Sequence, residues 1–298
     1  MAAVPSQAQA SGCSRAACAH SASSAGAGSK PGRAHKAWPA YADNTAPALD
    51  ALCAQAAREH PDAWAWDGTA ASAAHLGVRV ARGEVEQLRA GVFGVGDEVC
   101  RCIEQQAPAW RLPALLLLAF AEDLAIVDAG DASVPWIAVT LPSHWAPEHK
   151  VGQHFAAIHA PVADADLLRR SGEALLRLVS AAQGWERFVW NVSDHPRLHA
   201  HPARVPRERW AVAASGELPP AWWRTERQTF LPLPELQQSV FTIQLDAQPL
   251  AEAIDSADKA SRLHDAIASM SPAVLQYRGL VPVREALLRW LADKAAAA

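Results

Sequence analysis

Apolar side chains recur at helical spacing in several stretches of this chain. Leu49, Leu52 and Ala56 share one face of a helix that the pattern predicts over 48–59. The segment 112–127 is so uniformly apolar that we expect it to form a buried helix. Other helices are predicted at 78–89, 97–106, 165–183, 249–269 and 282–297.

Other stretches carry β-branched and aromatic residues between turn signals, which is typical of strands. The segment 134–141 reads VPWIAVTL, and 187–192 reads RFVWNV. Two more strands are predicted at 228–233 and 240–245. The chain therefore reads as a helical N-terminal half followed by strands mixed with helices. This order predicts an α+β fold with a small, mainly antiparallel sheet.

The first 38 residues differ in composition from the rest. They are rich in Ala, Ser and Gly, and they carry four basic side chains but no acidic one. Without periodicity, this segment cannot bury enough apolar surface to offset the entropy of ordering. We expect 1–38 to be a disordered tail and 45–298 to form a single domain. An organelle transit peptide is the alternative that the acid-poor composition leaves open.

The composition of the whole chain excludes several classes of protein. Its 27 basic and 31 acidic side chains argue against a dedicated nucleic-acid-binding protein. No apolar run reaches the roughly 18 residues that a membrane-spanning helix needs. The five cysteines form no CxxC pair, so we expect neither a disulfide framework nor a zinc or iron–sulfur site. These features predict a cytoplasmic protein that binds neither nucleic acid nor a membrane.

His159 is the histidine whose surroundings most suggest chemistry. It lies in FAAIHAPVAD, after apolar Phe155 and Ile158 and just before Pro161. Such an apolar frame holds an imidazole in a fixed direction, as an axial ligand to haem iron requires. A core histidine that hydrogen-bonds a backbone carbonyl is the alternative. Histidines also recur every five residues over 144–159, but this spacing fits no single helix or strand face, so we expect no four-histidine metal site.

A second cluster of polar side chains enters a predicted strand within WWRTERQT at 222–229. Alternation along a strand places Glu226 and Gln228 on one face and Arg227 and Thr229 on the other. Charged side chains in a sheet are costly to bury unless they are paired. An inward Glu226 could hold an ammonium substrate, and Arg227 could hold a haem propionate with two hydrogen bonds. A structural Arg–Glu pair is the alternative that these residues leave open.

Several short motifs, in a fixed order, resemble those of one protein family. They are AEDLAIVD at 121–128, PSHWAPEHKVG at 142–152, IHAPVAD at 158–164, RFVWNV at 187–192, WRTERQTFLPLP at 223–234, VFTIQL at 240–245 and YRGL at 277–280. Their order and spacing resemble the haem-dependent oxidative N-demethylase alpha-subunit-like family, once called DUF3445. The resemblance extends from about Leu112 to Leu291.

The resemblance implies a fold, a cofactor and a reaction. The characterised relative binds haem b in a PAS-like domain, activates O2 and releases a methyl group of dimethylamine as formaldehyde. Its electrons come from a separate flavin and iron–sulfur reductase subunit. The same is expected of this chain, namely a PAS-like antiparallel sheet with surrounding helices, haem b, O2 as co-substrate, a small amine as substrate and a separate flavin/iron–sulfur reductase.

The resemblance also implies roles for four residues. His159 would be the axial iron ligand, and Glu226 would position the amine. Arg227 and Lys150 would bind the haem, with Arg227 at a propionate. All four stand within the motifs that carry the resemblance.

Some positions depart from the family motifs and keep two other functions open. Leu245 and Asp246 stand where the family has a Tyr, Leu231 and Pro232 replace two Arg, and Ala163 replaces a Pro. A haem-binding sensor or carrier without turnover is the first alternative. A cofactor-free structural or interaction protein is the second.

Overall fold

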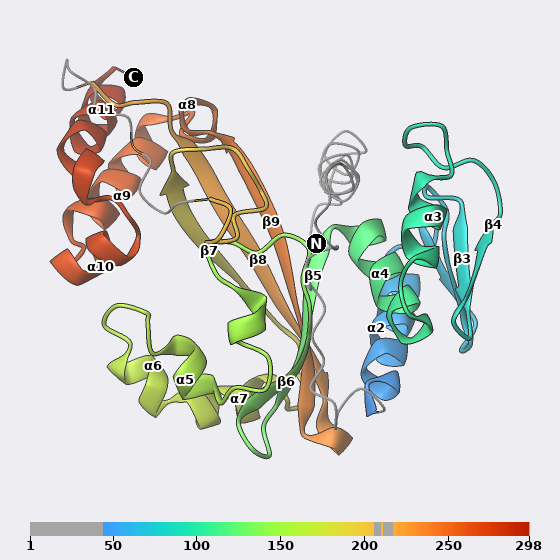
Figure 1. Ribbon diagram of the computed structural model, residues 1–298. Helices are drawn as coiled ribbons and strands as arrows, with labels where there is room; N and C mark the ends of the chain where they lie inside the picture. Colours follow the sequence, from blue (N-terminus) through green and yellow to red (C-terminus); the bar gives the residue numbers. More distant parts are fainter. Residues whose placement is uncertain (1–43, 206–209, 211–216, 298) are drawn as a thin grey trace.

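Two antiparallel sheets carry the fold, and two helices pack between them (Figure 1). The computed structural model describes residues 44–205, 210 and 217–297, so the predicted disordered tail at 1–38 lies outside the described part. All strand pairs of both sheets are antiparallel, which confirms the α+β class. A PAS-like fold and a single domain over 45–298 remain predictions.

The N-terminal sheet is a four-stranded meander that the sequence analysis missed. Its strands follow one another in space as in sequence, as β1 (Trp64–Trp66), β2 (Ala70–Ala73), β3 (Val78–Ala81) and β4 (Glu84–Gln87). The helix predicted over 78–89 is therefore wrong. Arg82 and Gly83 both have positive φ, 50° and 80°, as a tight hairpin turn requires. Val78 and Val80 are buried at a spacing of two, which is the strand signal in this segment.

The segment predicted as one long buried helix over 112–127 is half helix and half strand. Helix α4 (Pro108–Phe120) is followed directly by strand β5 (Glu122–Asp128). Ala121 separates them because its φ of 54° is left-handed and ends the helix. A glycine usually marks this position, so an alanine gives no stop signal. A continuous apolar run does not by itself distinguish helix from strand.

The second sheet has five strands and carries the candidate site. Its order is β6-β5-β9-β8-β7, with β6 (Ser133–Ala138), β7 (Trp185–Ser193), β8 (Trp222–Leu233) and β9 (Gln238–Pro249). The strands predicted at 134–141, 187–192, 228–233 and 240–245 are all confirmed, although β8 and β9 are longer than expected. Strand β5 joins the sheet beside β9, with Glu122 opposite Gln244.

The two faces of the five-stranded sheet pack against different layers. Leu124 and Ile126 join α2 (Ala46–Glu59), α4 and the N-terminal sheet in one core. Ala125 and Phe241 on the other face pack with α5 (Phe155–His159) and α7 (Gly172–Val179). A Cβ atom at Gly172 would lie 2.5 Å from the Phe155 ring, so this glycine lets α7 approach α5 closely.

The remaining helices agree in part with the sequence. Helices are confirmed near 48–59, 97–106 and 282–297, whereas those at 165–183 and 249–269 are each divided. Ser171 separates α6 (Asp166–Arg170) from α7. Ser256 caps the second of the two helices that form where one was predicted at 249–269. The further elements are α3 (Glu98–Glu104), α8 (Leu250–Ala253), α9 (Ala257–Ala268), α10 (Pro272–Tyr277) and α11 (Arg284–Ala296). None of the described helices is long and apolar enough to cross a membrane.

Candidate functional site

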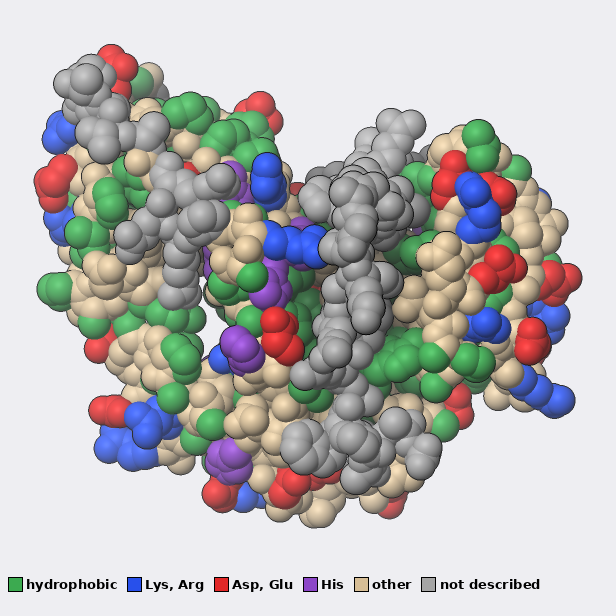
Figure 2. Space-filling view, viewed as in Figure 1, with side chains coloured by type: hydrophobic (Ala, Val, Ile, Leu, Met, Phe, Trp, Pro, Cys, Tyr) green, Lys and Arg blue, Asp and Glu red, His purple; other side chains and the backbone are tan. Residues whose placement is uncertain are grey.

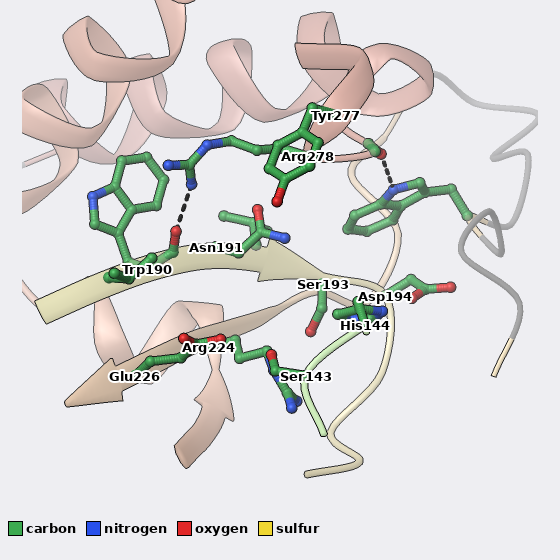
Figure 3. A pocket seen from close by; sticks show the side chains of 14 residues that line it. Ser143, His144, Trp190, Asn191, Ser193, Asp194, Arg224, Glu226, Tyr277 and Arg278 are labelled. Atoms are coloured by element: carbon green, nitrogen blue, oxygen red, sulfur yellow. Dashed lines mark hydrogen bonds between the residues drawn. The ribbon is translucent and has the colours of Figure 1, made fainter. Parts of the chain in front are cut away.

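A pocket of about 150 Å³ lies where β7 and β8 meet α10; we call it the β7–β8 pocket. Figure 3 shows Tyr277 and Arg278 on its α10 side and Arg224 and Glu226 on strand β8 opposite them. Acidic, basic and uncharged polar side chains line it. They are Ser143, His144, Asn191, Ser193, Asp194, Arg224, Glu226, Tyr277 and Arg278.

Glu226 is held in this pocket by a short chain of hydrogen bonds. The side-chain amide of Gln228 donates to Glu226 Oε2 at 2.7 Å. Arg187 Nε in turn donates to Gln228 Oε1 at 2.7 Å. Arg187 lies directly opposite Gln228 in the β7–β8 register, so the three side chains share one face of the sheet. The chain fixes the carboxylate of Glu226 and places a guanidinium near it.

Arg224 is buried below the pocket and clamps two loops onto the sheet. Only 2% of the residue is exposed. Its Nε donates to Ser143 Oγ at 2.8 Å, its Nη1 donates to the Arg197 carbonyl oxygen at 2.7 Å, and its Nη2 donates to the Leu198 carbonyl oxygen. All three nitrogens are thus engaged by the protein. Arg224 is therefore a structural cation of the pocket wall.

Asp123 supports the same wall from strand β5. Its Oδ1 accepts hydrogen bonds from the backbone N–H groups of Thr140 and Leu141, at 2.7 and 3.1 Å. Burial raises the pKa of Asp123 from 3.8 to about 7, and the negative charge of Glu226 adds to the effect, whereas the hydrogen bonds oppose it. The carboxyl group therefore titrates near neutral pH.

We expect the contribution of Asp123 to the stability of the protein to fall as the pH rises from about 4 to 7. Between the unfolded and folded pKa values of Asp123, the folded state holds more protons than the unfolded state, so rising pH favours unfolding. Asp123→Asn keeps an oxygen acceptor for both N–H groups but cannot ionise. Urea unfolding should show the variant gaining stability over the wild type between pH 5 and pH 8, by up to about 3 kcal/mol. If the free energies of unfolding of the variant and the wild type differ by the same amount at pH 5 and at pH 8, this expectation is wrong.

His159 ends helix α5, and its ring is oriented by the helix itself. Its Nδ1 is 2.9 Å from the Phe155 carbonyl oxygen, which only accepts, so Nδ1 carries the proton and Nε2 the lone pair. The Phe155 ring packs 4.0 Å from the imidazole, centroid to centroid. Burial lowers the pKa of His159, and the positive charges of Arg187 and Lys150 lower it further, against the effect of the carbonyl. The neutral imidazole is thus favoured.

The residues around His159 fit a haem group. A neutral imidazole with its lone pair on Nε2 is the form that binds iron. Lys150 donates to the Ile158 carbonyl oxygen at 2.7 Å, and both Lys150 and Arg187 act electrostatically on His159. These two cations are suited to haem propionates. Figure 2 shows a hollow in the molecule with His, Lys and Arg side chains near it.

The β7–β8 pocket itself is too small for the whole cofactor. Sites that enclose a cofactor-sized ligand have volumes of roughly 300–1,000 Å³, against about 150 Å³ here. The pocket volume suits a small molecule. Arg187 connects the two groups of residues, because it lies near His159 and reaches Glu226 through Gln228.

The structure places Arg227 on the opposite face of the sheet from Glu226, as the strand alternation predicts. Its Nε donates to Glu186, and its Nη1 is 3.8 Å from Glu122 Oε1. These residues line a second cavity of about 290 Å³ next to α2. Arg227 is therefore not brought together with His159, Lys150 and Glu226. Two other arginines, Arg187 and Arg224, share the sheet face of Glu226.

Sequence reasoning did not single out several residues of the site. Arg187, Asn191, Tyr277 and Arg278 were not among the candidates, although all but Arg187 line the β7–β8 pocket. The alternation in RFVWNV places Arg187 and Asn191 on one face of the strand, which is a usable signal. Their proximity to Glu226, however, depends on the β7–β8 register.

One family model matches a large part of the chain, including the strands that form the β7–β8 pocket. Residues 97–288 match a family model described as haem-dependent oxidative N-demethylase, alpha subunit-like. The match covers more than half of the chain and includes His159, Glu226 and Arg278. Among the described residues, no group of three or more His, Cys, Asp or Glu side chains is arranged to hold a metal ion.

Proposed function

Since this chain belongs to the haem-dependent oxidative N-demethylase alpha-subunit-like family, we propose that it is a haem-binding oxygenase subunit that removes a methyl group from a small amine. The family name implies a haem cofactor and further subunits. Haem b as the cofactor, O2 as co-substrate and a separate flavin/iron–sulfur reductase are parts of the proposal.

The observation that carries the proposal is the state of His159. Its ring is oriented by the Phe155 carbonyl and half-buried, and burial lowers its pKa, which favours the neutral imidazole. We assign His159 as the axial ligand and Lys150 and Arg187 as the cations that meet the propionates. Bound haem would supply the activation of O2.

Glu226 is assigned to the amine. A carboxylate accepts N–H hydrogen bonds from an ammonium group, and a charge-assisted bond of this kind is stronger than a neutral one. Gln228 and Arg187 hold the carboxylate in place before the amine arrives, which lowers the entropic cost of binding. In the overall reaction one oxygen atom leaves in formaldehyde and the other in water, with two electrons from the reductase and two protons.

The test begins with the absorption spectrum of the full chain expressed with a haem precursor. We expect a stoichiometric Soret band that shifts when the protein is reduced with dithionite and exposed to CO. Dimethylamine with an electron donor should then yield formaldehyde. A chain that binds no haem after reconstitution contradicts the proposal. A Soret band without formaldehyde from any amine identifies a sensor or carrier instead.

A further inference from the structure

The β7–β8 pocket carries balanced charges, which a site for a simple ammonium ion does not need. Arg224 and Arg278 contribute two positive charges to its lining, and Asp194 and Glu226 contribute two negative charges. Arg224 is already engaged by three protein acceptors. An ammonium ion alone would therefore leave Arg278 without an anionic partner among the described residues. A ligand that carries both charges would satisfy both sides.

The acceptor side of the pocket consists of Glu226 and Asn191. In the β7–β8 register Glu226 pairs with Val189, and Arg224 pairs with Asn191. Glu226 and Asn191 are therefore diagonal neighbours on one face of the sheet. Diagonal neighbours lie about 7–8 Å apart, which leaves room for a nitrogen between them. Asn191 Oδ1 is buried, and no group in the described part of the chain donates to it. An N–H of a ligand would supply the missing donor.

The donor side of the pocket is Arg278, at the end of α10. Its guanidinium lies over the Trp190 ring, 4.7 Å from the centroid, and its Nη1 donates to the Trp190 carbonyl oxygen. These two contacts fix the plane of a group that carries several further N–H donors. A planar guanidinium held in this way is suited to a carboxylate. Both Arg278 and Glu226 line the pocket, and Figure 3 shows them on either side of strand β7 in this view.

We propose that the pocket binds a zwitterionic N-methyl amino acid, with its ammonium group at Glu226 and Asn191 and its carboxylate at Arg278. N-methylglycine is the smallest member of this class. The pocket volume of about 150 Å³ equals that of about five water molecules, which suits a ligand of this size. The inference deepens the proposed function and rests on it for turnover. N-methylglycine, O2, two electrons and two protons would give glycine, formaldehyde and water, as the N–CH3 bond breaks.

Calorimetric titration of the haem-loaded full chain tests the binding directly. N-methylglycine should bind at least about tenfold more tightly than dimethylamine, because only the amino acid offers a carboxylate to Arg278. Arg278→Met should weaken N-methylglycine binding by about 10- to 100-fold and abolish this preference. Arg278→Lys keeps the charge and should retain part of the preference. Circular dichroism checks that both variants are folded.

Arg262→Met on α9 is the matched control, because this exposed arginine pairs with Asp258 away from the pocket. It should keep the wild-type preference. Equal affinity for N-methylglycine and dimethylamine in the wild type would overturn the inference, as would a preference that survives Arg278→Met. Tight N-methylglycine binding without formaldehyde would support the pocket assignment while the proposed function fails. Formaldehyde from dimethylamine with no binding of N-methylglycine would support the proposed function and overturn the inference about the pocket.

Discussion

Arg224→Met is expected to destabilise the protein by about 3–5 kcal/mol, because it removes one member of a buried charged network. Three acceptors lose their donor at once, namely the Ser143 hydroxyl and the carbonyl groups of Arg197 and Leu198. The charge of Arg224 also acts on Asp123 and Glu226, and both carboxylates would lose this nearby cation. The two loops that Arg224 ties to the sheet should therefore detach.

Urea unfolding and thermal melting measure this effect. The expected loss lowers the melting temperature by on the order of 10 °C for a domain of this size. Arg227→Met is the matched control, three positions along the same strand but on the other face. Its side chain is 40% exposed and pairs with exposed Glu186, so its loss should cost less than about 1 kcal/mol. Similar losses in the two variants would show that the Arg224 clamp is not important for stability.

His159→Ala is expected to abolish stoichiometric haem binding, because iron would lose the ligand that the protein orients. The substitution leaves a space next to the Phe155 ring and removes the hydrogen bond to the Phe155 carbonyl oxygen. Free imidazole added to the variant should enter this space and restore part of the Soret band. The measurement is haem content and the oxidised and reduced spectra after reconstitution.

His264→Ala provides the control for this experiment. His264 lies on α9 beside Asp265, far along the chain from the residues that surround His159. The control should keep the haem content and spectrum of the wild type. If His159→Ala also keeps the wild-type spectrum, the axial ligand is a different residue, and our assignment is wrong.

The sequence was informative about the second sheet because its strands are long and rich in β-branched and aromatic residues. The N-terminal meander was missed because its strands are only three or four residues long. A pattern of this length also fits one or two turns of a helix. Ala121 shows a different limit, since an alanine with a left-handed conformation depends on what packs around it.

The candidate site was predictable only in part for a related reason. The residues next to His159 and Glu226 in the sequence suggest chemistry at these two side chains, so both could be selected from the sequence. Arg278 and Asn191 line the same pocket as Glu226 only because of the β7–β8 register and the position of α10. Such long-range relations leave no mark in local periodicity. Arg227 lies on the opposite face of the sheet from Glu226, as the alternation predicts, and its place at a haem propionate stays a prediction.

The pairing of β5 with β9 also determines when the site can form during synthesis. Residues 122–128 of β5 pair with residues 238–244 of β9. The centre of the sheet therefore joins two strands that lie far apart in the sequence. Closing so long a loop is entropically costly and slows folding. The N-terminal meander pairs only neighbouring strands, so it can fold while the ribosome is still producing the rest. We therefore expect nascent chains that end before β9 to expose the apolar surface of α4 and β5, and to need protection from a chaperone until the last strand emerges.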